Sequence, residues 1–170
     1  MQARYKIVIA DTSCFILLDK IGELDLLKSL FKSVVTTSVV AAEFGMELPE
    51  WINVRNVLNI HFQAMLDVDP GEASAIALAM ESKPSLLILD DQKARKVAKR
   101  LNLNYTGTLG VFFKAKQAGI IPSVKYVLEK VQLTNFRYSH QVSQEILFLQ
   151  ESPVDPNFLS RITTARSNFP

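Results

Sequence analysis

Two kinds of hydrophobic pattern alternate along the chain. Short runs of consecutive apolar residues, such as residues 7–10 and 86–89, are followed by stretches in which apolar residues recur every three or four positions. Continuous runs are typical of parallel strands buried on both faces, and the wider spacing is typical of amphipathic helices. The alternation predicts an α/β fold with three layers, α/β/α, around a mainly parallel sheet of about four or five strands.

The same pattern predicts where the elements lie. Strands are expected at residues 5–10, 33–37, 86–89 and 103–106. Helices are expected at about residues 14–21, 23–31, 38–47, 73–81, 94–101, 108–117, 122–133 and 139–150. The pattern is weakest at residues 47–69, which are expected to hold a short helix and a strand or loop.

Length and composition indicate one globular domain with a substantial core. The chain has 170 residues, of which 48% are hydrophobic and 21% charged. We expect residues 1–150 to form this domain, with the helix at 139–150 as a C-terminal extension, and residues 151–170 to form a loosely held tail. The net charge of +2 is small, so any site for a polyanion must be a local patch.

The residues present exclude several classes of site. Cys14 is the single cysteine, and His61 and His140 lie far apart, so the chain has neither an internal disulfide nor zinc-ligand spacing. Cys14 falls on an apolar stripe and is expected to pack in the core. No glycine-rich nucleotide-binding motif is present. The chain also has no signal-peptide pattern and no apolar stretch long enough to span a bilayer, so we expect a cytoplasmic location and no membrane partner.

Carboxylates stand at the carboxyl ends of two predicted strands. Asp11 follows the run at 7–10, and Asp90 and Asp91 follow the run at 86–89. Ligands of open α/β sheets gather at this edge, which makes these residues candidates for a functional site. The alternative is local, because Asp is a favoured N-cap and one member of the pair can simply cap the helix that follows.

Two glutamates on predicted helices each have two interpretations. Glu43 has apolar neighbours three and four positions away, so it is either a buried carboxylate that needs a cation or metal, or an exposed residue at the edge of the stripe. Glu72 stands three residues after Asp69 in a pattern typical of a capping box. It also shares a helix face with small residues and can point inward, so both of its roles stay open.

The predicted sheet brings these carboxylates to one cleft. Several carboxylates in one cleft raise one another's pKa values unless divalent cations neutralise them. Ligand sets made only of oxygen favour Mg²⁺ or Mn²⁺. The acidic cluster therefore suggests metal-assisted attack of water on a phosphodiester, beside a helix that carries Lys93, Lys96 and Arg100.

Five motifs, in this order, resemble the PIN domain. They span roughly residues 5–133 and are Ile9–Ser13, Val39–Phe44, Gly71–Ala79, Leu89–Arg95 and Thr106–Thr108. They are most similar to the prokaryotic branch related to VapC-type toxins. No single motif is specific, but the order of the five is.

The resemblance implies a metal-dependent endoribonuclease, a hydrolase selective for single-stranded RNA, with Mg²⁺ or Mn²⁺ as cofactor. Its catalytic carboxylates are then Asp11, Glu43, Glu72, Asp90 and Asp91. The resemblance implies that the metal ligands are Asp11, Glu43, Glu72 and Asp91, of which Asp91 matches the usual position by its spacing to Ala94 and Arg95. Asp90 is then the residue that caps the helix or supports the site from outside. Glu72 departs from the family pattern, which commonly has Asp there, and its longer side chain changes the metal geometry.

The resemblance also implies contacts and partners. Ser13 or Thr108 positions a ligand or phosphate, and Lys93, Lys96 and Arg100 hold the RNA, although a solvated basic helix face is an equal alternative for these three cations. A toxin of this type has an antitoxin protein as its partner. The family and the apolar helix at 139–150 indicate a homodimer.

Other acidic sites fit the sequence less well. A phosphoacceptor domain of the response-regulator type carries its paired acids near the start of the chain, whereas here the pair comes late. Phosphatases with an Asp nucleophile have a second Asp two residues on, where this chain has Ser13. The more serious alternative is a catalytically weak PIN-like protein, or a nucleic-acid interaction module, that uses the same cleft.

Overall fold

A computed structural model, which describes residue 5 and residues 7–135, has a sheet of five parallel strands at its centre. The strands lie in the order β3-β2-β1-β4-β5, and each pairs in parallel with its neighbours. Their bounds are β1 Ile7–Ala10, β2 Val34–Thr37, β3 Ile52–Arg55, β4 Ser85–Ile88 and β5 Asn104–Thr106. The predicted parallel sheet of four or five strands is confirmed.

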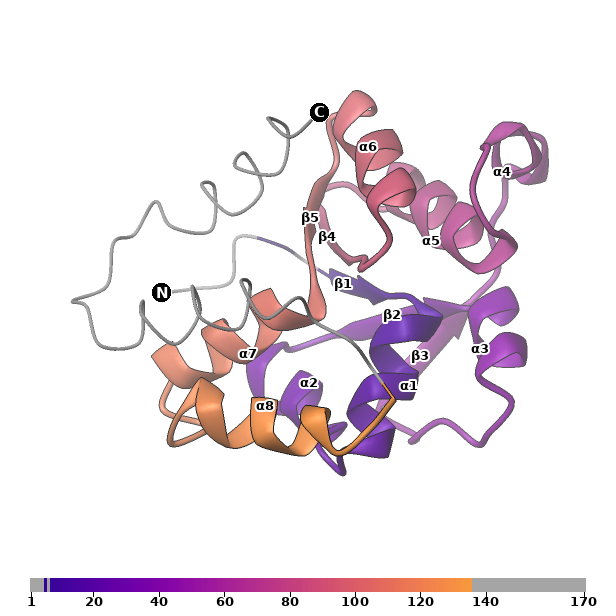
Figure 1. Ribbon diagram of the computed structural model, residues 1–170. Helices are drawn as coiled ribbons and strands as arrows, with labels where there is room; N and C mark the ends of the chain where they lie inside the picture. The colour runs from indigo at the N-terminus through magenta and orange to yellow at the C-terminus, as the bar shows by residue number, and fades with distance from the viewer. Residues whose placement is uncertain (1–4, 6, 136–170) are drawn as a thin grey trace.

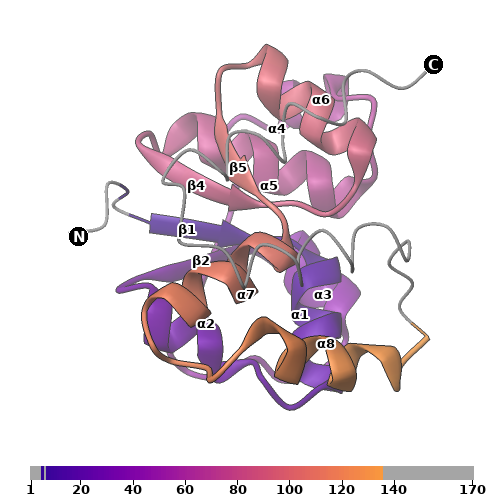
Figure 2. The same cartoon turned by 60° about the vertical axis from the view of Figure 1, so that its left-hand side comes forward.

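Helices cover both faces of this sheet, as the predicted three-layer architecture requires. Figure 1 shows α4, α5 and α6 on one face and α1, α2, α7 and α8 on the other, and Figure 2 shows the same division from another side. The bounds are α1 Thr12–Lys20, α2 Asp25–Leu30, α3 Ser38–Phe44, α4 Ile60–Met65, α5 Pro70–Glu81, α6 Gln92–Arg100, α7 Thr108–Gln117 and α8 Val124–Gln132. The helix α3 contacts both α1 and α5.

Alternate strand residues supply two separate cores. On β1, Val8 and Ala10 pack with Phe15 and Phe112 in the core beneath α1 and α7. Ile7 and Ile9 face the opposite core, which α5 and α6 complete. Because both faces are covered, the strands read as continuous apolar runs rather than as an alternation of apolar and polar residues.

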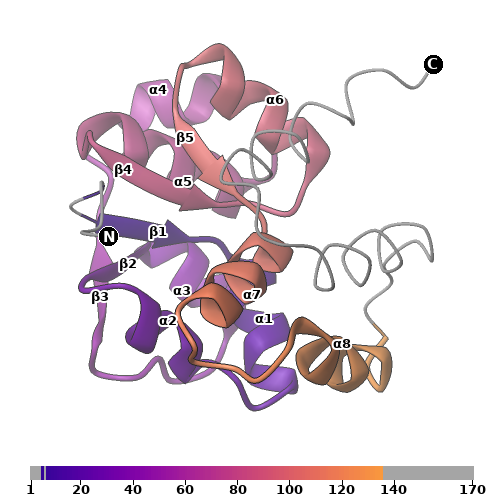
Figure 3. The same cartoon turned by 90° about the vertical axis from the view of Figure 1, so that its left-hand side faces the viewer.

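Hydrogen bonds align the carboxyl ends of the central strands. The Asp11 amide donates to the Ile88 carbonyl at 3.3 Å, and the Leu89 amide donates to the Thr106 carbonyl at 2.8 Å. The buried Thr36 hydroxyl donates to the Ala10 carbonyl at 2.9 Å. The residues that follow β1, β2, β4 and β5 therefore emerge side by side, at the edge visible in Figure 3 where the helices α1 and α7 begin.

Several further predictions can be compared with the structure. Residues 47–69 contain the edge strand β3 and the short helix α4. Cys14 is completely buried, and this burial raises the pKa of its thiol well above the ordinary value, which is consistent with the predicted packing role. The predicted helix at 139–150 and the tail at 151–170 lie outside the described residues. Within residues 7–135, each helix is too short or too polar to cross a membrane.

Candidate functional site

Asp11 is a buried carboxylate at the end of β1. Its Oδ1 accepts hydrogen bonds from the amides of Ser13 (2.7 Å) and Cys14 (3.4 Å), so the side chain caps α1. Its Oδ2 is buried and has no hydrogen-bond partner among the residues that the structure describes. Burial, and then the negative charge of Asp90, raise the pKa of Asp11 from 3.8 to about 7. A buried oxygen of this kind is satisfied by a proton or by a cation.

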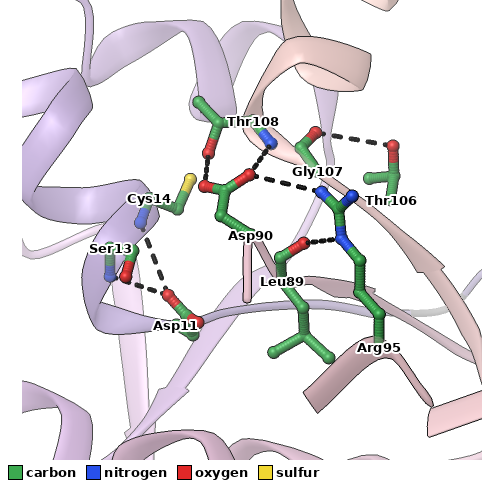
Figure 4. Close-up of polar contacts among 9 residues, drawn as sticks. All are labelled: Asp11, Ser13, Cys14, Leu89, Asp90, Arg95, Thr106, Gly107 and Thr108. Atoms are coloured by element: carbon green, nitrogen blue, oxygen red, sulfur yellow. Dashed lines mark hydrogen bonds and ion pairs between the residues drawn. The ribbon is translucent and has the colours of Figure 1, made fainter. Parts of the chain in front are cut away.

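Asp90, at the end of β4, is held by three donors. Its Oδ1 accepts from the Thr108 amide at 2.9 Å, and its Oδ2 accepts from the Thr108 hydroxyl at 2.5 Å. The third donor is Arg95, whose Nη2 lies 3.5 Å from Oδ1. Figure 4 shows the carboxylate directed at the start of α7, above Asp11. The neighbouring strands β1 and β4 thus place two interacting carboxylates at one edge.

Asp91, and not Asp90, caps α6. The Asp91 backbone is extended (φ −70°, ψ 135°), and its side chain accepts from the Ala94 amide at 2.8 Å. The interpretation of Asp90 as the cap was therefore wrong. The turn after β4 directs the Asp90 carboxylate toward β5 and α7 and leaves the exposed Asp91 carboxylate at the N-terminus of α6. The helix dipole favours a negative charge at that position.

Glu43 is exposed and lies at the edge of its helix stripe. Its Oε2 accepts a hydrogen bond from the Thr12 hydroxyl at 2.7 Å, which joins α3 to the start of α1. The carboxylate also lies directly over Gly71, so closely that a Cβ at that position would overlap Oε2. Of the two interpretations that the sequence left open for Glu43, the exposed one is correct. The missing side chain of Gly71 is what lets it approach α5.

Glu72 caps its own helix and also faces other carboxylates. Its Oε2 accepts from the Asp69 amide at 3.3 Å, as the capping-box pattern predicts. Partial burial, and then the charge of Asp91, raise the pKa of Glu72. Glu72 and Asp91 both line an open cavity of about 200 Å³, together with Asp67, Val68, Asp69 and Lys93. The cap and the inward orientation are thus compatible.

Two buried hydroxyls fix α5 against α3. The Ser74 and Thr37 hydroxyls lie 2.6 Å apart, and Ser74 donates to the Gly71 carbonyl at 2.7 Å. Thr37 also caps α3 by accepting from the Val40 amide at 3.1 Å. Hydrogen-bonded polar groups in a core specify one arrangement of the elements that carry them. This pair holds the first turn of α5, and with it Glu72, beside the helix that carries Glu43.

The predicted substrate contacts are only partly brought together. Ser13 is exposed next to Asp11, whereas Thr108 is completely buried, and both its donors serve Asp90. Lys93 lines the acidic cavity, and its Nζ lies 2.9 Å from the exposed carboxylate of Asp67. Lys96 and Arg100 are exposed farther along α6. At 1.5 Å per residue, Arg100 stands about 12 Å beyond the start of that helix.

The chemistry of the donors fits a divalent cation, although they are not gathered into a finished ligand set. Within the described part of the chain, no three acidic, histidine or cysteine side chains form a group that could hold one ion. Glu43, Glu72, Asp90 and Asp91 are each turned toward a protein donor. Among the described residues, the buried Oδ2 of Asp11 lacks a hydrogen-bond partner, and it is therefore the oxygen best suited to bind a cation. Carboxylate oxygens suit Mg²⁺ or Mn²⁺.

Sequence reasoning assigned no role to Arg95, Gly71 or Gly107. The signals were present but weak. Arg95 is a cation in the first turns of α6, where a positive charge opposes the helix dipole. Gly71 stands in the first turn of α5, and Gly107 joins β5 to α7. Glycine at such positions can indicate that another group approaches the backbone closely.

Comparison with known proteins identifies the family of the chain. A family model described as a PIN domain matches residues 7–152. Neither a curated protein nor a solved structure matches the chain.

Proposed function

Because the chain belongs to the PIN domain family, whose members are generally metal-dependent nucleases, we propose that it hydrolyses single-stranded RNA at this acidic edge. The observation that carries the proposal is the Asp11 carboxylate, which is buried near the Asp90 charge and has one oxygen without a partner among the described residues. Such a group costs free energy in the metal-free protein. A bound cation would offset this cost by interacting with the unpartnered Asp11 oxygen.

Asp11 and Asp90 would hold the ion from the ends of β1 and β4. Glu43 and Glu72 would join from α3 and α5, and Asp91 would remain the outer carboxylate because it caps α6. A bound divalent cation supplies activation of water and neutralisation of the charge that develops on the phosphate. Thr108 orients Asp90, and the exposed Ser13 lies where an RNA phosphate can reach it.

The finer assignments belong to the same proposal. RNA as the substrate, a place in the VapC-type branch and an antitoxin partner rest on the resemblance carried by the five motifs, and a homodimer rests on the family and the apolar segment at 139–150. Lys93 lines the acidic cavity and is the cation best placed for a phosphate, with Lys96 and Arg100 extending the basic face of α6. Co-purification of the product of an adjacent small gene would support the toxin role.

Metal binding is the direct test. Calorimetric titration of the metal-free protein with Mn²⁺ is expected to show binding with a Kd of about 10⁻³ M or tighter. Asp11→Asn is expected to abolish this binding. Asp19→Asn, which changes an exposed carboxylate on the same helix, serves as the control and should bind Mn²⁺ normally. Absence of binding to the unaltered protein at millimolar Mn²⁺ would sink the nuclease proposal.

Gly71→Ala is expected to lower activity without lowering stability. The added Cβ displaces the Glu43 carboxylate from α5 and from its hydrogen bond with Thr12. Alanine within a helix is itself favourable by about 0.5–1 kcal/mol, which offsets the cost of moving an exposed side chain. We expect cleavage to slow by about 10-fold, because misplaced catalytic groups are costly.

The check on Gly71→Ala is a parallel measurement of melting temperature and cleavage rate. Glu43→Gln is the matched variant, since it keeps the length of the side chain and can still accept from Thr12 but loses the charge. If Gly71→Ala cleaves at the full rate while Glu43→Gln does not, then the position of Glu43 over Gly71 is unimportant for activity.

One observation favours the alternative of a nucleic-acid interaction module. Each of the five candidate carboxylates already accepts a hydrogen bond from a protein donor, so the same residues could form a cleft that binds RNA without cleaving it. Fluorescence anisotropy with labelled single-stranded RNA separates the two functions. Binding in EDTA, with no cleavage after Mn²⁺ is added, would favour the module.

A further inference from the structure

Arg95, near the start of α6, contacts the two residues that follow β4. Its Nε donates to the Leu89 carbonyl at 2.7 Å, and its Nη2 lies 3.5 Å from Asp90 Oδ1, so one guanidinium spans two consecutive residues. The Arg95 and Asp90 side chains are only 18% and 20% exposed. Figure 4 shows the guanidinium lying between the strand end and Gly107. This planar fork is a geometry that lysine cannot reproduce.

Gly107 provides the space for that guanidinium. A Cβ built on Gly107 would overlap Nη2 of Arg95 and would lie 3.0 Å from Asp90 Oδ1. The backbone of Gly107 is extended (φ −103°, ψ 174°), a conformation open to any residue. The backbone therefore does not require glycine here. The requirement comes from the Arg95 side chain that lies against it.

The contacts of Asp90 show what this arrangement controls. Thr108 supplies two donors from one side, and Arg95 supplies the third. The Asp90 charge in turn acts on Asp11, whose pKa is raised first by burial and then by this charge. A carboxylate held at both oxygens has a single direction relative to its neighbour, and catalytic groups lose about 10²-fold in rate when misplaced by 1 Å.

We propose that Arg95 is a positioning residue: acting through Asp90, it fixes the direction of that carboxylate at the acidic edge, and Gly107 leaves the room it needs. The role in catalysis rests on the proposed nuclease function. Arg95 does not touch the RNA in this proposal. A contact between Arg95 and an RNA phosphate is the competing possibility, and the experiment separates the two.

The test uses Arg95→Lys, Gly107→Ala and the double variant. Arg95→Lys keeps the positive charge but loses the planar guanidinium. Gly107→Ala keeps the arginine but places a methyl group in the space that its guanidinium occupies. Lys99→Arg, a substitution of an exposed residue on the same helix, is the control. Three quantities are measured: hydrogen exchange of the Thr108 amide in metal-free protein, the Kd for Mn²⁺, and kcat and KM on a single-stranded RNA.

Both single variants are expected to speed exchange of the Thr108 amide by about 10-fold, since this amide donates to Asp90 and exchange reports local opening. They should weaken Mn²⁺ binding and lower kcat by about 10- to 100-fold, with KM for RNA unchanged. The double variant should resemble either single variant, because the two changes disrupt one contact.

Three results would overturn the proposal. A raised KM with unchanged kcat would mean that Arg95 binds the RNA itself. Fully additive losses in the double variant would mean that Gly107 and Arg95 act separately, and unchanged Thr108 exchange would mean that Arg95 does not hold Asp90. If the unaltered protein neither binds Mn²⁺ nor cleaves RNA, the nuclease function fails, while Thr108 exchange still decides whether Arg95 positions Asp90.

Discussion

Asp11→Asn is expected to lower the rate of cleavage by about 10²- to 10³-fold while making the metal-free protein more stable above pH 7. Asp11 is 2% exposed, and its second carboxylate oxygen lacks a hydrogen-bond partner within the described part of the chain. At alkaline pH the folded protein must carry a buried, uncompensated charge there. Asparagine keeps an oxygen that can accept from the Ser13 amide and removes the charge. The loss of this carboxylate should lower kcat by about 10²- to 10³-fold, because the cation that it would hold is the group that stabilises the developing charge.

The pH dependence of stability follows from the raised pKa of Asp11. The unfolded chain releases this proton near pH 4, and the folded protein releases it only near pH 7. The folded state therefore binds the proton more tightly, so its advantage is full below pH 4 and is lost as the pH rises through 7. A rise of this size corresponds to about 4 kcal/mol.

Thermal unfolding of metal-free protein at pH 5 and pH 8 checks this prediction. Asparagine leaves its own amide unpaired, so we expect a net gain of about 1–3 kcal/mol at pH 8, or a Tm higher by about 5 °C. At pH 5 the gain should disappear. Mn²⁺ should stabilise the unaltered protein and Asp19→Asn but not Asp11→Asn, because only a protein that binds the ion gains from it. A lower Tm for Asp11→Asn at pH 8 would contradict the account of Asp11.

Asp90→Asn is expected to be far more damaging than Asp91→Asn. The amide at position 90 can still engage Thr108, but the substitution removes the negative charge that lies beside the poorly exposed Arg95 guanidinium. Hydrogen bonds to charged groups contribute about 1.5–3 kcal/mol, so stability should fall by an amount of this order. Cleavage should fall by about 10²-fold, because both the charge and the direction of the group change.

Asp91→Asn is the matched control for this prediction. Asparagine is about as good an N-cap as aspartate, so the hydrogen bond from the Ala94 amide can be kept and stability should hardly change. Activity should fall by only a few-fold. Steady-state cleavage and denaturant unfolding of the two variants, measured side by side, decide the matter. If Asp90→Asn and Asp91→Asn lose equal activity, then Asp91 is a metal ligand, as the motif spacing predicts.

Elements whose signals are local were predicted closely. The helix expected at 108–117 is α7, Thr108–Gln117, and the Asp69–Glu72 cap opens α5 as the sequence indicates. The apolar stripe of α6 is buried at Ala94, Val97 and Ala98. Caps and stripes depend on residues within four positions of each other, so the information for them lies within the segment itself.

The adjacent acids after β4 show where local signals stop. Both Asp90 and Asp91 are acceptable caps by type, and one residue separates their positions. Which one turns to the helix depends on the backbone of the turn, and that turn is held by contacts with Thr106, Thr108 and Arg95. These contacts join residues far from the pair or on another element, so spacing alone chose the wrong cap.

By itself, the sequence determined the layers, four of the five strands and the sheet edge that the acidic residues follow, because burial on both faces and the direction of parallel strands follow from the apolar pattern. Only the tertiary structure decided which side chains meet there. Glu43 lies over Gly71, and Arg95 lies against Gly107, because glycines on other elements leave room for them. The space beside a backbone is set by packing between distant segments, and no local pattern encodes it.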